Sequence, residues 1–155
     1  MRPGATSGSA SLQLRLARIE ELGELEDLQR RASLALDEYR EALIAHPDAI
    51  VLPFEQIERG EVVVAEIDGR IAGFAVVLDQ DGAAELDGLF VEPGLWRQGV
   101  GSALVREAVH EARSRGLSLL TVVASPGAKE FYERCGFTVE ASAETRFGPA
   151  LRMSR

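Results

Sequence analysis

The stretch EPGLWRQGVGSALVREAV, residues 92–109, places two glycines directly before a run that has the composition of a helix. A glycine inside a helix costs about 1 kcal/mol relative to alanine, so Gly99 and Gly101 require an explanation. The N-terminus of a helix offers unpaired backbone N–H groups and a partial positive charge, and this combination binds phosphate. We therefore interpret RQGVGSA, residues 97–103, as an anion cradle whose bare backbone lets a diphosphate come close.

Two well-known phosphate-binding loops fit this stretch poorly. A Walker loop has lysine and then serine or threonine after its second glycine, whereas Ser102 and Ala103 follow Gly101. A dinucleotide-binding loop has a third small residue at the position of Leu104 and follows the first strand of its unit. A tight strand-to-helix turn that binds nothing stays open as the alternative.

The N-terminal part of the chain predicts one strand followed by helices. Alternation over residues 11–18 predicts a strand with one buried face, formed by Leu12, Leu14 and Leu16. Apolar residues at three- and four-residue steps predict an amphipathic helix over residues 19–36. A second helix is expected over residues 37–45, and LPFEQIERG, residues 52–60, adds a short helical turn.

The rest of the chain predicts strands on both sides of the helix that follows the glycines. Two β-rich runs joined by Asp68 and Gly69 predict a hairpin. Residues 83–91 predict a further strand, and the apolar run over residues 117–124 predicts a buried one. Because a helix crosses between these last two strands, they should pair in parallel. The remaining expected elements are a helix over residues 126–136 and strands over residues 137–143 and 144–153.

Length and composition predict one ordinary globular domain. The chain has 155 residues, of which 46% are hydrophobic and 27% are charged. We expect a loose tail over residues 1–10 and a single domain over residues 11–155. The net charge of −8 argues against general affinity for nucleic acids or acidic membranes. It suits a cationic substrate, although solubility alone explains an acidic surface equally well.

The cysteine content and the hydropathy pattern predict the cellular setting. Cys135 is the single cysteine, so an internal disulfide and a cysteine-based zinc site are both excluded. No signal peptide or membrane-spanning run is apparent, which favours a cytoplasmic protein. His46 and His110 have no metal-ligating partners at the usual spacings, and we expect no metal.

Two motifs together resemble the GCN5-related N-acetyltransferase (GNAT) family. LFVEPGLWRQGVGSALVREA, residues 89–108, is similar to the family's coenzyme-A-binding motif, Gln/Arg-x-x-Gly-x-Gly/Ala. SPGAKEFYERCGF, residues 125–137, is similar to the next motif, Asn-x-x-Ala-x-x-Phe-Tyr-x-x-x-Gly-Phe. The resemblance spans residues 12–153 and implies a GNAT-like acyl-CoA N-acyltransferase fold of the α/β class. Such a fold is a single domain whose mixed, mostly antiparallel sheet has one splayed parallel strand pair and is flanked by helices.

The resemblance implies acetyl transfer from the co-substrate acetyl-CoA to a primary amine by direct attack. The amine would belong to a small molecule, a peptide N-terminus or a lysine. Acetyl-CoA would lie where the strand ending at Val91 splays from the strand starting near Leu117, with its pantetheine arm on the first strand and its diphosphate on backbone N–H groups of residues 98–102. The implied binding residues are Leu89, Phe90, Val91, Arg97, Gln98, Gly99, Val100, Gly101, Ser102, Ser125 and Phe131.

Two positions depart from the family motifs. Trp96 stands where the first motif has Gln or Arg, so a side-chain contact to phosphate is missing or is supplied by Arg97. Ser125 replaces the Asn of the second motif and reaches less far. These departures leave a second hypothesis open, a non-catalytic module that binds or senses acyl-CoA.

The resemblance also implies catalytic roles. Tyr132, in the unbroken match FYERCGF, would protonate the departing thiolate, and packing beside neighbouring phenylalanines is its alternative role. Glu85 lies where several family members carry the base that deprotonates the amine, and a solvated carboxylate is the alternative. For Asp87, two residues along the strand, we favour the solvated role.

The acceptor pocket in this family is built mainly from the first two helices and the C-terminal strands, here residues 31–54 and 141–149. The first of these segments is acidic, which suggests a cationic amine, although solvated surface acids explain it equally well. Neither the acyl chain length nor the choice between a monomer and a homodimer follows from the sequence.

Overall fold

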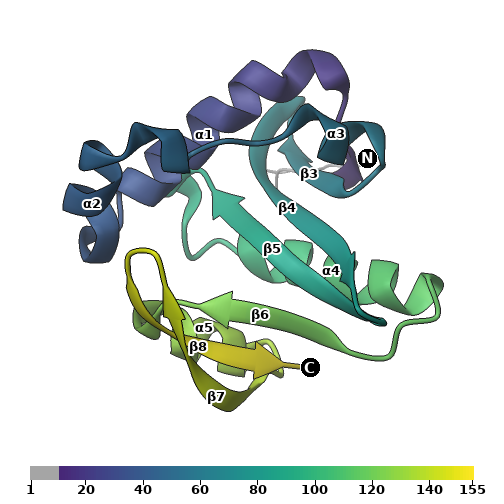
Figure 1. The fold of residues 1–155 in the computed structure, drawn as a ribbon. Coiled ribbons are helices and arrows are strands. Elements are labelled where there is room, and N and C mark those ends of the chain that lie inside the picture. The colour runs from purple at the N-terminus through teal and green to yellow at the C-terminus, as the bar shows by residue number, and fades with distance from the viewer. Residues whose placement is uncertain (1–10) are drawn as a thin grey trace.

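The computed structural model describes residues 11–155, which form one seven-stranded sheet with the order β2-β3-β4-β5-β6-β8-β7 (Figure 1). Neighbouring strands are antiparallel except for β5 and β6, which are parallel. The expected tail over residues 1–10 lies outside the described residues. The strands are β2 Leu12–Leu16, β3 Val62–Ile67, β4 Arg70–Gln80, β5 Ala83–Val91, β6 Leu120–Ala124, β7 Thr138–Thr145 and β8 Gly148–Ser154.

Helices cover both faces of the sheet. On one face α1 and α3 pack around Phe74, and on the other face α4 and α5 pack around Leu104 and Phe137 (Figure 1). None of the helices within residues 11–155 has the length and apolarity needed to cross a bilayer. The helices are α1 Leu22–Leu34, α2 Arg40–Ala45, α3 Phe54–Glu58, α4 Val100–Ser114 and α5 Lys129–Arg134, and the 3₁₀ turns are η1 Ile19–Glu21, η2 Asp37–Tyr39, η3 Pro47–Ala49, η4 Pro93–Leu95 and η5 Pro126–Ala128.

The parallel pair predicted from the crossover helix is confirmed, and the two strands of this pair diverge. Residues 84–86 of β5 pair with residues 120–122 of β6, and the pairing stops there. Strand β5 nevertheless continues to Val91, where it still pairs with β4. The last part of β5 is therefore paired on one edge only, as the resemblance implied.

A β-bulge at Asp87 accompanies this divergence. On β4, Val76 lies opposite Gly88 and the next residue, Val77, lies opposite Leu86, so Asp87 is an extra residue on β5. A bulge bends its strand and increases the local twist. It also shifts the alternation of side chains, since those that join the core beneath α4 are Ala84 and Leu86 before the bulge and Leu89 and Val91 after it.

The prediction that Leu12, Leu14 and Leu16 form a buried face is wrong. These side chains are 37%, 36% and 53% exposed. Strand β2 lies at the edge of the sheet and pairs only with β3, and the core under α4 is built from β3, β4, β5, β6 and β8. Alternation in the sequence predicts the strand correctly, but it does not reveal which strand lies at the edge.

Some predicted boundaries also shift. The helix expected over residues 19–36 is a 3₁₀ turn followed by α1, and β6 begins at Leu120 instead of Leu117. The last hairpin turns at Arg146 and Phe147, three residues later than predicted, because Thr145 organises the turn. The Thr145 hydroxyl donates to the Gly148 carbonyl at 2.7 Å and accepts from the Phe147 N–H at 3.3 Å.

Gly73 on β4 lies in close contact with α4 and with β5. A Cβ at this position would lie 2.7 Å from the Phe90 carbonyl oxygen and 3.3 Å from the side chains of Val100 and Leu104. We expect Gly73→Ala to lower the free energy of unfolding by about 1–3 kcal/mol, because backbone and helix must move apart. Urea denaturation measures this change.

Gly23→Ala is the matched control, because Gly23 lies in α1 and, apart from neighbouring residues of the same helix, no described atom comes within 4 Å of a Cβ built there. This variant should be more stable than the wild type by about 0.5–1 kcal/mol, since alanine is the better helix former. Equal stability of the Gly73→Ala variant and the wild type would contradict the tight contact.

Candidate active site

A cavity of about 720 Å³ opens where β5 and β6 diverge. Its walls are the end of β5, the turn into α4, the turn into α5, and the segment from α1 to η2. The structure thus brings most of the predicted site residues together. Those that line the cavity are Leu89, Phe90, Val91, Arg97, Gly99, Gly101, Ser102, Ser125, Phe131 and Tyr132.

Three predicted residues do not line this cavity. The Gln98 side chain turns back and donates to the Gly94 carbonyl at 3.4 Å, and Val100 is buried in the core beneath α4. Both were predicted through their backbone N–H groups, which stay at the turn. Glu85 lies on β5 before the bulge, in the part of the strand that still pairs with β6.

The two glycines of the turn serve different purposes. Gly99 caps α4 with φ = 87°, in the left-handed region that favours glycine, and Arg97 two residues earlier also has a positive φ of 66°. Gly101 lies against Phe131, since a Cβ on Gly101 would come within 3.2 Å of that ring. Gly99 therefore permits the sharp turn, and Gly101 permits the close contact between α4 and α5.

A run of backbone amides is left unpaired at this turn. The first hydrogen bond into α4 is the one from the Ala103 N–H to the Gly99 carbonyl, at 3.0 Å. Within residues 11–155, the N–H groups of residues 98–102 have no acceptor. Consecutive unpaired amides at the start of a 15-residue helix favour an anion, as the sequence predicted.

Trp96 links this turn to the end of β5. Its indole N–H donates to the Val91 carbonyl at 2.8 Å. The N–H of Glu92 donates to the Ala72 carbonyl at 2.9 Å, on the edge of the chain that faces β4. Because backbone groups alternate between the two edges of a strand, the N–H and C=O groups of Val91 and Leu89 face the opposite, open edge. Trp96 therefore occupies one carbonyl of the open edge and leaves the Val91 N–H and both Leu89 groups available.

Tyr132 combines a packed ring with a hydroxyl that has no protein partner. The ring meets Phe131 and Phe137 edge-on, at centroid distances of 5.0 and 5.4 Å, and the residue is only 7% exposed. Burial raises the pKa of the phenol above its usual value, so the hydroxyl stays protonated at neutral pH. Tyr132 lines the cavity, and within residues 11–155 its hydroxyl forms no hydrogen bond.

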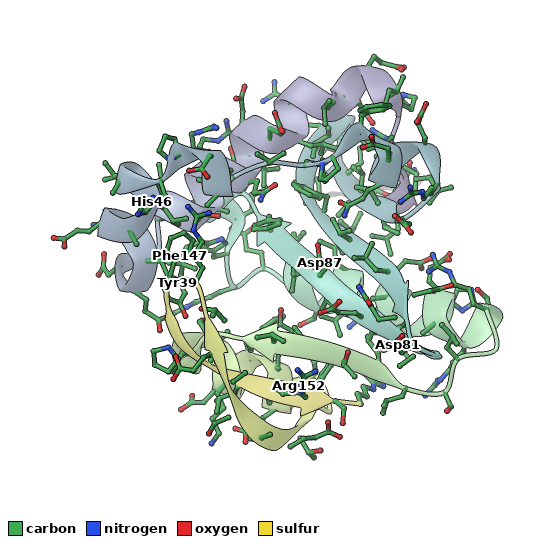
Figure 2. The ribbon with its side chains drawn as sticks, in the orientation of Figure 1. Tyr39, His46, Asp81, Asp87, Phe147 and Arg152 are labelled. Carbon is green, nitrogen blue, oxygen red and sulfur yellow. The ribbon has the colours of Figure 1, made fainter. Side chains whose placement is uncertain are left out.

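The carboxyl groups of β5 lie near the point where the strands separate. Partial burial and the neighbouring Asp87 raise the pKa of Glu85, while Arg152 of β8 opposes this shift. Burial also raises the pKa of Asp87, which lies midway along β5 in Figure 2. No group of three His, Cys, Asp or Glu side chains among the described residues could hold a metal ion.

The two segments predicted to form the acceptor pocket meet in the structure. The ring of His46 lies 5.8 Å from that of Phe147, and both residues are labelled in Figure 2. Arg146 of the β7–β8 turn pairs with Asp48 at 3.4 Å and lies over the Phe147 ring.

Much of the acidity of the first segment is compensated by local partners. Asp48 is paired with Arg146, and Asp37 pairs with Arg40 at 2.7 Å. The Glu38 carboxylate accepts from the Gly127 N–H at 3.3 Å, across the cavity from η2 to η5. The acidic composition of this segment thus gives little support to a strongly cationic acceptor.

Four lining residues, Ala32, Ser33, Leu36 and Glu38, fall in the segment 31–54 that was predicted for the acceptor pocket, although none was predicted individually as a binding residue. The lining residues that were not predicted come from the turns into α4 and α5 and from α5 itself: Leu95, Trp96, Gly127, Ala128 and Arg134. Trp96 was noticed as a departure from a motif, but its hydrogen bond to β5 was not foreseen.

Comparison with known proteins gives consistent relatives. An uncharacterized N-acetyltransferase of Methanocaldococcus jannaschii is 32% identical over 48% of this chain and 37% of its own length. The uncharacterized N-acetyltransferase YafP of Escherichia coli is 37% identical over 54% of this chain and 49% of its own length. The chain therefore spans less than half the length of either relative.

The fold also matches solved structures. The PaiA N-acetyltransferase of Thermoplasma acidophilum, crystallised in complex with coenzyme A, superposes with a TM-score of 0.77 at 22% identity, covering 94% of this chain and 98% of that protein. The family model described as acetyltransferase (GNAT) family matches residues 25–137, more than half of the chain. Since this matched segment contains the diverging strands, the glycine turn and α5, the chain belongs to the GNAT family of acetyltransferases.

Proposed function

We propose that this chain is an acetyl-CoA-dependent N-acetyltransferase that acts on a primary amine of a small molecule, a peptide N-terminus or a lysine. One observation carries the proposal: a single cavity connects the unpaired amides at the start of α4 to Tyr132. An extended acyl-CoA requires a site that binds an anion at one end and holds the reacting thioester at the other.

The binding residues follow from the geometry of the cavity. The amides of residues 98–102 hold the diphosphate, and the open edge of β5 pairs with the amide groups of the pantetheine arm. On that edge the N–H and C=O of Leu89 are available to the arm, and the N–H of Val91 stays free for the reacting carbonyl. The cavity volume of about 720 Å³ lies within the range of small-molecule sites.

The chemistry forms a C–N bond from the amine to the acetyl carbonyl and breaks the C–S bond of the thioester. The amine must first lose a proton, because a free lysine-type amine has a pKa of about 10.4. Glu85 accepts this proton through water, and the Val91 N–H stabilises the oxyanion that develops on the carbonyl. Tyr132 donates its proton to the departing thiolate, a role that suits a phenol kept protonated by burial. The second proton that the nitrogen loses as the amide forms returns to Tyr132 through water.

Tyr132→Phe tests the proposed acid. We expect kcat to fall by about 10²–10⁴-fold, because the proton donor is lost, while the dissociation constant of acetyl-CoA changes little. Release of the CoA thiol in an amine panel measures turnover, and calorimetry measures binding.

Ser114→Ala is the control, because it also removes one hydroxyl, and Ser114 lies at the end of α4, outside both this cavity and the segments predicted for the acceptor pocket. Undiminished kcat in Tyr132→Phe would exclude the acid role. Binding of acetyl-CoA without turnover of any amine by the wild type would favour a sensing module instead.

Glu85→Gln tests the proposed base. The raised pKa of Glu85 means that its carboxylate forms at a higher pH than usual, so kcat/KM of the wild type should fall as the pH drops through this pKa. In Glu85→Gln we expect that limb to disappear and kcat to fall by about 10²-fold. Asp87→Asn is the matched comparison on the same strand, and a larger loss in Asp87→Asn would reassign the base.

Trp96→Phe tests the link between the turn and β5. Phenylalanine keeps most of the ring but cannot donate to the Val91 carbonyl. Because one exposed hydrogen bond contributes about 1 kcal/mol, we expect the dissociation constant of acetyl-CoA to rise about fivefold with little change in kcat. A loss of kcat at unchanged binding would show that Trp96 acts on the reaction and not on the binding edge.

A further inference from the structure

A second cavity, of about 370 Å³, lies beside the first, against α4 and α5. Three arginines line it, Arg106, Arg134 and Arg155, and no acidic residue does. Ser102 of α4 and Arg134 of α5 line both cavities, so the two cavities adjoin at these residues. The N–H of Ser102 is also one of the unpaired amides of the proposed diphosphate site.

The charge of these arginines is not neutralised within residues 11–155. Arg106, Arg134 and Arg155 form no ion pair there, and Arg155 donates one N–H to the Cys135 carbonyl at 2.7 Å. Burial raises the pKa of the Cys135 thiol, and the positive charges of all three arginines oppose this shift. The three guanidinium groups therefore lie near that one side chain. The chain as a whole has a net charge of −8, so this cluster is a local concentration of positive charge on an acidic protein.

We propose that this arginine-lined cavity binds the 3′-phosphate of the adenosine of CoA. The proposal rests on the proposed function, because it requires the diphosphate at the start of α4. The diphosphate and the 3′-phosphate of CoA are carried by the same ribose. A diphosphate held at Ser102 therefore brings the 3′-phosphate to the adjoining cavity, where planar guanidinium groups match its oxygens.

Arg106 and Arg134 then have distinct positions. Arg106 lines only the second cavity and contacts only the 3′-phosphate. Arg134 lines both cavities and lies where the two phosphate groups meet. Arg106 is thus the position at which the 3′-phosphate can be tested separately from the rest of the ligand.

Calorimetric titration of the full chain with CoA and with 3′-dephospho-CoA tests the proposal. We expect the wild type to bind CoA about tenfold or more tightly than dephospho-CoA. Arg106→Ala should reduce this preference about three- to tenfold by weakening CoA alone, since solvent exposure limits each contact. Arg134→Ala should reduce it similarly and also weaken dephospho-CoA.

Arg113→Ala is the matched control, because Arg113 is an exposed arginine on the same helix and lines neither cavity. It should keep the wild-type preference. Thermal unfolding of each variant confirms that these exposed substitutions leave the fold intact.

The outcomes separate this proposal from the one on which it rests. Equal affinity of the wild type for CoA and dephospho-CoA, or an equal loss of both in Arg106→Ala, would overturn the 3′-phosphate assignment and leave the proposed function standing. Failure of the wild type to bind either ligand would overturn both. Competition adds an independent arm: adenosine 3′-phosphate 5′-diphosphate should displace CoA better than adenosine 5′-diphosphate, from which it differs only by the 3′-phosphate. Equal displacement would overturn the assignment.

Discussion

The separation of β5 from β6 is the constraint on which the rest of the site depends. If the two strands paired along their whole length, the N–H and C=O groups of Leu89 would be used within the sheet. The bulge at Asp87 bends β5 away after three paired residues and leaves one edge open in the middle of the domain. Unpaired backbone groups are costly when buried, so an open edge inside a sheet is stable only where a cavity or a ligand satisfies it.

Helix α4 holds this opening in place and directs its own amides toward it. Its packing on β4 depends on the missing side chain of Gly73, and its contact with α5 depends on that of Gly101. Trp96 ties the turn before α4 to the last carbonyl of β5. The anion-binding amides, the open strand edge and Tyr132 are thus carried by elements that pack directly on one another, which gives the preorganised geometry that a reacting site needs.

The sequence was sufficient for the element order and for much of the site, because both depend on local patterns. The crossover helix predicted the parallel pair, and Gly99 and Gly101 predicted the amide cradle. The exposure of Leu12, Leu14 and Leu16 depends on which strand lies at the sheet edge, which alternation does not encode. The bulge at Asp87 arises from pairing with β4, and Glu38 reaches the cavity only through the packing of distant segments.

The distribution of charge explains how an acidic chain can accept a highly anionic ligand. On the side of α4 and α5, the helix N-terminus and the three unpaired arginines create a local positive potential. Many carboxylates elsewhere are held by partners, as in the pairs Arg31–Glu92 and Arg40–Asp37. Glu85 and Asp87 lie on β5 with raised pKa values, and neither lines the arginine-lined cavity or the cavity at the diverging strands. The phosphates of a bound ligand are therefore drawn toward the start of α4, where the helix N-terminus and the arginines supply positive potential.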